Sequence, residues 1–251
     1  MQPLLLLLAF HLLPGTIAED IIGGHEARPH SRPYMAFVVF LHGDMWGICG
    51  GFLVEEDFVL TIAHAPGRHM YVILGAHDIV LQEKTQQEIP VKKAIPHPNF
   101  NNGSGRNDIM ILQLTAKAQL TAAVGLIPLP GESDQVRPGQ VCSVAGWGDI
   151  TQNDTTSKLH EVDLIIQEHF QCERHHMYYD RTTQLCVGDP QKQMSFFKGD
   201  SGGPLVCNNV AQGIASYGRE EGIPPNVFTN ISSFLPWIKK TIKRLQMDES
   251  P

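Results

Sequence analysis

Short apolar runs separated by turn-forming residues follow one another along most of this chain. They are rich in β-branched and aromatic residues, which is typical of strands, and they cover residues 34–40, 58–60, 71–74, 109–112 and 210–214. Twenty-three glycines and 17 prolines punctuate the sequence, and such residues mark turns. Helical periodicity begins only near residue 234. The pattern predicts an all-β chain closed by one C-terminal helix, with Ser232 or Ser233 as its N-cap.

The first residues have the pattern of a processing segment. Residues 4–13 form an apolar run broken only by His11, which is too short to span a bilayer. Small residues follow, as a signal-peptidase site requires. We interpret residues 1–18 as a secretory signal peptide and expect no membrane anchor, because no later stretch is long and apolar enough.

Charge and cysteine content exclude several classes of partner and cofactor. The net charge is −7, and it becomes −5 without residues 1–20, which carry Glu19 and Asp20 but no Lys or Arg. An acidic chain of this kind argues against nucleic acid as a partner. No two of the five cysteines have the close spacing of a zinc site. We therefore expect neither a metal nor another cofactor.

Three sequons fit a secretory route. They begin at Asn102, Asn153 and Asn230. Each is a candidate for N-glycosylation, although sequons also occur by chance.

A glycine-rich segment near the C-terminus contains a candidate nucleophile. Residues 199–204 read Gly-Asp-Ser-Gly-Gly-Pro and contain Ser201. A serine hydroxyl needs a nearby base and an orienting acid. His64 follows one strand-like run, and Asp108 precedes another. The order His, Asp, Ser argues against an esterase or lipase of the Gly-x-Ser-x-Gly type, in which the order is Ser, Asp, His.

These segments resemble the chymotrypsin-like (trypsin-fold) serine proteases. The resemblance extends over nearly all of the chain after residue 20, and it is closest to the granule proteases: granzymes, mast-cell chymases and cathepsin G, above all granzymes B and H. The segments that carry it include residues 21–36, 74–77, 144–148, 197–201 and 235–240. It implies a protease domain over residues 21–251, built from two antiparallel six-stranded β-barrels and a C-terminal α-helix. The barrels would cover about 21–125 and 126–251.

The resemblance implies a role for each residue of the catalytic centre. Ser201 would attack the scissile carbonyl, His64 would take its proton, and Asp108 would orient the imidazole. Backbone N–H groups of Gly199 and Ser201 would form the oxyanion hole.

It also implies an activation step. Residues 19–20 would be an activation dipeptide that a dipeptidyl peptidase removes. The freed ammonium of Ile21 would then pair with Asp200 inside the protein, where an unpaired carboxylate is costly.

The odd number of cysteines leaves one without an internal partner. The resemblance implies the disulfides Cys142–Cys207 and Cys172–Cys186. A third normally joins the counterpart of Cys49 to a cysteine after the catalytic histidine, but Ala65 stands there. We expect Cys49 to be a buried, inert thiol in a monomer. The alternative is an exposed thiol that links two copies.

Proteases of the family that this chain resembles select substrates with a specificity pocket. The resemblance implies which residues of this chain line that pocket. They are Ser195, Phe196, Ser216, Tyr217, Gly218 and Asn226. No aspartate stands at the floor position Ser195, so Lys and Arg specificity is excluded, and an uncharged residue before the scissile bond is expected. Phe196 would narrow the pocket if it pointed inward. If it pointed outward, we expect a preference for Phe, Tyr, Leu or Met.

The sequence therefore predicts a secreted or granule serine endopeptidase of immune effector cells, which cleaves proteins or peptides and is open to serpin inhibitors. The alternative is a protease-fold binding or signalling protein with weak or no activity. This alternative is suggested by Ile62, Ala65 and Phe196. They differ from the residues usual in the family and lie close in sequence to His64 or Ser201.

Overall fold

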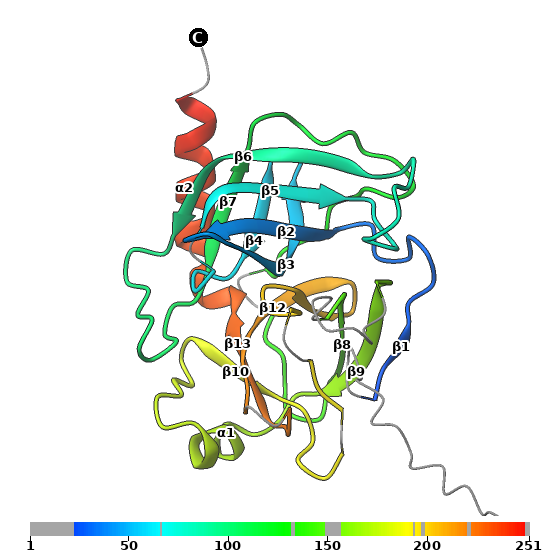
Figure 1. The fold of residues 1–251 in the computed structure, drawn as a ribbon. Coiled ribbons are helices and arrows are strands. Elements are labelled where there is room, and N and C mark those ends of the chain that lie inside the picture. The colour runs from blue at the N-terminus through cyan, green and yellow to red at the C-terminus, as the bar shows by residue number, and fades with distance from the viewer. Residues whose placement is uncertain are drawn as a thin grey trace, which may run out of the picture.

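The computed structural model describes residues 23–65, 67–131, 134–148, 157–192, 194–196, 199–219 and 222–248. Antiparallel strands dominate it and form two sheets, one above the other in Figure 1. All five strand-like runs predicted above are strands in the structure. No helix in these residues is long and apolar enough to cross a membrane.

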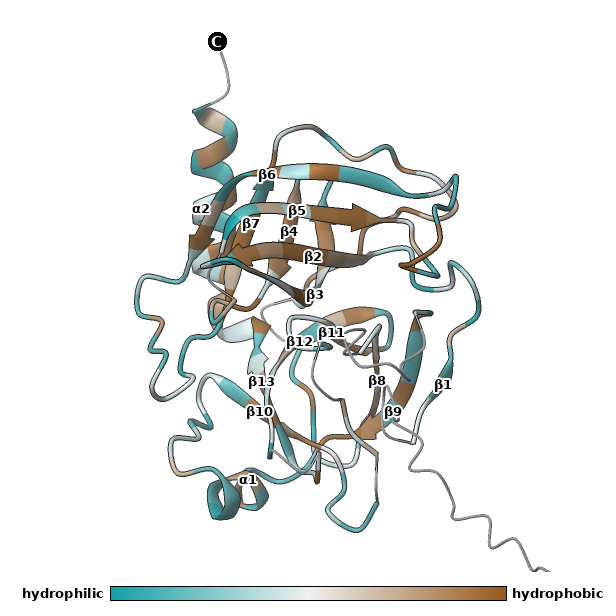
Figure 2. Cartoon of the chain, in the orientation of Figure 1, coloured by the Kyte–Doolittle hydropathy of each residue, from teal (hydrophilic) through white to brown (hydrophobic). Residues whose placement is uncertain are grey.

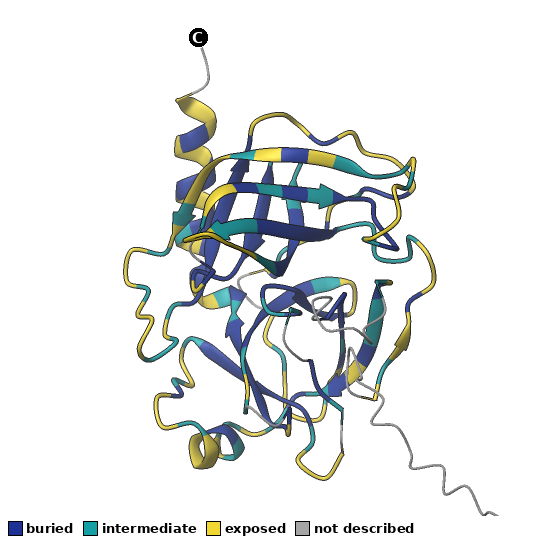
Figure 3. Cartoon of the chain, viewed as in Figure 1, coloured by how far each residue is buried: buried dark blue, intermediate teal, exposed yellow. Residues whose placement is uncertain are grey.

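The first sheet is a closed six-stranded barrel, as predicted. Its strand order is β2-β3-β4-β7-β6-β5. The strands are β2 (Met35–His42), β3 (Met45–Glu55), β4 (Phe58–Thr61), β5 (Arg68–Leu74), β6 (Gln87–Pro96) and β7 (Met110–Leu114). Apolar residues dominate β2, β4 and β7 in Figure 2, and Figure 3 shows that these three strands are largely buried. Burying these side chains drives closure of the barrel.

The second sheet has seven strands rather than the expected six. Its order is β1-β9-β8-β11-β12-β13-β10. The strands are β1 (His25–Glu26), β8 (Val141–Gly146), β9 (His160–Ile165), β10 (Gln184–Val187), β11 (Pro204–Cys207), β12 (Val210–Tyr217) and β13 (Asn226–Asn230). An isolated bridge between Ile166 and Val187 brings β10 back to the end of β9. The extra strand is β1, which pairs with β9 and satisfies that strand's edge.

Each end of the described chain packs against the half of the protein on the other side of the expected boundary at residue 125. Strand β1 belongs to the second sheet, whereas helix α2 (Leu235–Met247) lies beside the first barrel in Figure 1. The ring of His97, just after β6, packs against Trp237 of α2 at 4.9 Å between ring centroids. The two sheets are thus joined by the chain ends as well as by the central linker.

The predicted serine N-cap of the C-terminal helix is wrong. A 3-10 turn (Ile231–Phe234) precedes α2, so Phe234 occupies the N-cap position and no side chain caps the helix. The Ser232 hydroxyl instead donates to Asn230 Oδ1, and the Ser233 hydroxyl donates to the carbonyl of Thr182. A helical pattern alone could not distinguish this 3-10 turn from the first turn of the α-helix.

Candidate active site

Strand pairing brings His64 and Asp108 together. Strands β4 and β7 are antiparallel, with Thr61 opposite Met110. If the same register continues past the strand ends, Asp108 lies opposite Ala63, next to His64. The two residues are 44 positions apart in sequence, yet His64 Nδ1 lies 2.6 Å from Asp108 Oδ2.

The carboxylate of Asp108 is fully buried and accepts four hydrogen bonds. The backbone N–H groups of Ala63 and His64 donate to Oδ1 at 2.8 and 2.9 Å. Oδ2 contacts His64 Nδ1 and accepts from the Ser216 hydroxyl at 2.6 Å. These donors satisfy a buried charge that would otherwise be costly. They also fix the plane of the carboxylate, and therefore the orientation of the imidazole.

Ser201 is held between the two sheets by its backbone. The N–H of Gly50, in β3, donates to the Ser201 carbonyl at 2.8 Å, and the N–H of Gly202 donates to the Ala215 carbonyl at 2.8 Å. A side chain at Gly202 would lie 2.2 Å from the carbonyl oxygen of Gly50, so this close approach requires glycine. The glycine-rich segment is thus explained by its docking onto the first barrel.

The Ser201 hydroxyl points toward the backbone of β12. It donates to the Ser216 carbonyl at 3.5 Å and, within the described residues, makes no hydrogen bond to His64. Catalytic hydrogen bonds are often long or misaligned without substrate. Gly199 belongs to the turn just before Ser201.

Asp200, beside the nucleophile, is completely buried. The Gly148 N–H donates to its Oδ1 at 2.9 Å. A side chain at Gly146 would lie 2.0 Å from the same oxygen, so glycine is required there too. Ile21, the predicted partner of Asp200, lies outside the described residues.

The floor of the predicted specificity pocket is polar and uncharged. Ser195 and Asn226 are buried, and the Asn226 side-chain N–H donates to the Ser195 hydroxyl, which donates to the Phe196 carbonyl. A side chain at Gly218 would meet Asn226 Oδ1 at 2.4 Å, so the asparagine lies directly beneath Gly218.

Phe196 points away from this floor. Its ring packs edge-on against Phe228 at 5.1 Å, within the apolar core of the second sheet. Of the two orientations considered from the sequence, the structure therefore has the outward one, in which the ring packs into the second core.

Cys49 is a free, buried thiol. Its side chain lies 3.5 Å from the Thr61 hydroxyl, and burial raises its pKa to about 12. A thiol that stays protonated and inaccessible favours the inert interpretation over an intermolecular disulfide. Ile62 and Ala65 are buried in the same apolar cluster as Cys49, and the hydrogen bonds between His64 and Asp108 are nonetheless formed.

Restoring the missing disulfide is expected to stabilise the protein. In Ala65→Cys, the new thiol would close a loop of about 16 residues with Cys49, worth about 3 kcal/mol of unfolding free energy. Denaturant unfolding measures the gain, and thiol titration should find no free thiol. The control is the double variant Cys49→Ala, Ala65→Cys, which cannot form the bond. An equal stability of the two variants would contradict the expectation.

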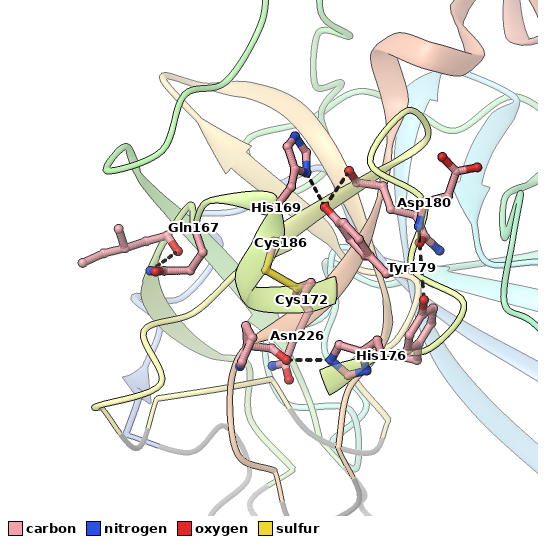
Figure 4. The surroundings of a disulfide bond; sticks show 12 residues. Gln167, His169, Cys172, His176, Tyr179, Asp180, Cys186 and Asn226 are labelled. Carbon is pink, nitrogen blue, oxygen red and sulfur yellow. Dashed lines mark hydrogen bonds between the residues drawn. A yellow bond between two sulfur atoms is a disulfide. The ribbon is translucent and has the colours of Figure 1, made fainter. Parts of the chain in front are cut away.

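Two disulfides join Cys142 to Cys207 and Cys172 to Cys186. The second ties helix α1 (His169–His175) to β10, as Figure 4 shows. The hydroxyl of Tyr179 contacts His169 Nδ1 in the same region. This disulfide therefore anchors the segment that follows α1.

A cleft of about 520 Å³ extends from the His64–Asp108 pair. Ser216 and Tyr217 line it, together with residues 102–105, between β6 and β7, and residues 175–178, which begin at the last residue of α1. Sequence reasoning identified Ser216 only as a pocket residue and missed both its bond to Asp108 and these two loops. No motif marks such loops, because their place at the cleft depends on the packing of the two sheets.

The sequons differ in their surroundings. Asn102 is exposed on the loop that lines this cleft. Asn230 is half-buried and accepts the hydrogen bond from Ser232. Asn153 lies outside the described residues.

Comparisons with known proteins agree with this geometry. Residues 21–238 match the family model described as Trypsin. The chain is 58% identical to human granzyme H, over 98% of this chain and all of that protein, and 57% identical to human granzyme B, over 97% and 100%. Mouse cathepsin G is 54% identical, over 97% and 94%. A solved structure titled "Structure of GrC" superposes with a TM-score of 0.84 at 50% identity, covering 88% of this chain and 99% of that one. The chain therefore belongs to the trypsin family and is a serine endopeptidase.

Proposed function

We propose that Ser201, His64 and Asp108 form the catalytic triad of this endopeptidase, and that it cleaves after an uncharged, preferably apolar residue. The main support is the His64–Asp108 pair, whose buried carboxylate accepts four hydrogen bonds beside the docked Ser201.

Each residue has a defined step in the reaction. Ser201 Oγ attacks the scissile carbonyl while His64 Nε2 takes its proton, and the imidazolium then protonates the leaving amine. Asp108 holds Nδ1–H and stabilises the imidazolium. The N–H groups of Gly199 and Ser201 would receive the oxyanion. In the second half of the reaction, His64 activates a water molecule that attacks the acyl-enzyme and releases Ser201.

Activation would follow removal of residues 19–20 by a dipeptidyl peptidase. Asp200 is the buried carboxylate that would receive the ammonium of Ile21. Burial of that charge next to Ser201 couples the new N-terminus to the order of the oxyanion hole. The similarity to granzymes and cathepsin G supports a place in secretory granules of immune effector cells. Inhibition by serpins is part of the same proposal.

The preference for an uncharged residue rests on the pocket floor. Ser195 and Asn226 satisfy each other by hydrogen bonding, so neither an acidic nor a basic side chain would find a charge partner in them. Such a charge would lose hydration without compensation. Because the Phe196 ring packs against Phe228 and not over the floor residues, we expect the pocket to accept Phe, Tyr, Leu or Met.

Peptides that differ only in the residue before the scissile bond test this preference. For the protein beginning at Ile21, we expect kcat/KM for Phe, Leu or Met to exceed that for Lys or Asp about 100-fold. Asn226→Arg should raise cleavage after Asp, because it places a cation at the floor. Asn226→Gln, which adds no charge, is the control. Efficient wild-type cleavage after Lys, Arg or Asp would overturn the proposal.

A further inference from the structure

We propose that Asn102 carries an N-glycan at the rim of the substrate cleft, and that this glycan restricts folded proteins more than extended peptides. The inference rests on the proposed protease function, because it concerns access to Ser201. It gives a role to a sequon that the catalytic mechanism does not use.

The side chain of Asn102 is available for modification. Asn102 is exposed, and within the described residues its side chain makes no hydrogen bond. Residue 103 is glycine, so the sequon lacks the proline that blocks glycosylation. Glycosylation would join the Asn102 amide nitrogen to the anomeric carbon of a lipid-linked oligosaccharide. One amide proton would be lost, and the lipid pyrophosphate would leave. The other described sequon differs, because Asn230 is half-buried and hydrogen-bonded.

The loop that carries Asn102 lines the same cleft as His64 and Asp108. It is also held in place. The backbone of Asn101 pairs with that of Arg106, and Asn101 Oδ1 accepts hydrogen bonds from the N–H and hydroxyl of Ser104. The Arg106 guanidinium donates to the carbonyl of Tyr178, in the segment after α1, at 3.4 Å. A glycan on this loop would therefore stay at the rim.

Two exposed apolar side chains lie on the rim of the same cleft. The side chains of Met177 and Tyr178 line the cleft and are 87% and 53% exposed. His176, next to them, is fixed by a hydrogen bond to the carbonyl of Pro225 at 3.0 Å. An N-glycan is bulky and hydrophilic, so it would shield this apolar rim and narrow the approach. An extended peptide is narrow enough to enter the cleft beside the glycan. A folded protein is wider, so its surface would collide with the glycan at the rim.

Four proteins made in glycosylating cells, each beginning at Ile21, test the proposal. Asn102→Gln and Ser104→Ala remove the sequon, whereas Ser104→Thr keeps it and is the matched control for the wild type. Glycopeptide mass spectrometry measures occupancy at Asn102. Kinetics compare kcat/KM for a short peptide with the inhibition rate by a protein inhibitor such as a serpin.

We expect Asn102 to be occupied in the wild type and in Ser104→Thr. Asn102→Gln and Ser104→Ala should both react about tenfold faster with the protein inhibitor, with peptide hydrolysis unchanged. An unoccupied Asn102, or inhibition rates that are the same with and without the glycan, would overturn the proposal. Absence of peptide hydrolysis in all four proteins would instead overturn the protease function on which it rests, and the restriction with it.

Discussion

Replacing Ser201 by alanine in the protein that begins at Ile21 is expected to lower kcat for peptide hydrolysis about 10⁶-fold. The alanine has no oxygen to form the acyl-enzyme, so only the oxyanion hole and substrate binding remain to accelerate the reaction. The loss should appear in kcat rather than KM, because the hydroxyl acts in the transition state. Steady-state kinetics on one efficient peptide give both constants.

Ser233→Ala is the matched control for that variant. It removes a serine hydroxyl of the 3-10 turn before α2, which donates to the Thr182 carbonyl and, within the described residues, makes no hydrogen bond to the triad. Its kcat should equal that of the wild type. If Ser201→Ala retained more than a few per cent of activity, another nucleophile would have to carry the reaction.

Replacing Asp108 by asparagine is expected to lower kcat/KM about 10⁴-fold, the size of effect known for this change in a chymotrypsin-like protease. The amide keeps the shape of the carboxylate but offers an N–H where the acid accepts hydrogen bonds. The new amide nitrogen would then face other donors. In one orientation these are the Ala63 and His64 N–H groups, and in the other they are His64 Nδ1–H and the Ser216 hydroxyl. The imidazole would lose the tautomer that can accept the Ser201 proton.

Asp163→Asn provides the comparison for this change, because Asp163 is exposed on β9. It makes the same chemical change on the surface and should leave kcat/KM unaltered. Folding of Asp108→Asn is checked by its circular dichroism spectrum. A folded Asp108→Asn with nearly wild-type activity would contradict the assigned role.

Much of the architecture could be predicted because local patterns and tertiary structure agree in this chain. The strand-like runs became strands, and the first barrel closed with the expected six. The proximity of His64 and Asp108 follows from the pairing of β4 with β7. The resemblance identified these residues by their flanking motifs without knowledge of that pairing.

Other features depend on packing that no local pattern records. The two-residue strand β1 exists because β9 offers it an edge. The outward turn of Phe196 depends on a space beside Phe228 in the second core. The Ser216 hydroxyl reaches Asp108 across 108 residues of sequence. Each of these requires the relative placement of two segments, which periodicity and turn residues leave undetermined.

We expect Ser201 to be an activated nucleophile even though residue 65, next to His64, is alanine where the related proteases have a cysteine. Labelling with a fluorophosphonate probe, followed by peptide mapping, tests it most directly. For the protein beginning at Ile21, we expect one probe per molecule, attached to Ser201, and none on Ser201→Ala. If the folded protein took up no probe, or took it up equally after Ser201→Ala, Ser201 would not be the activated nucleophile.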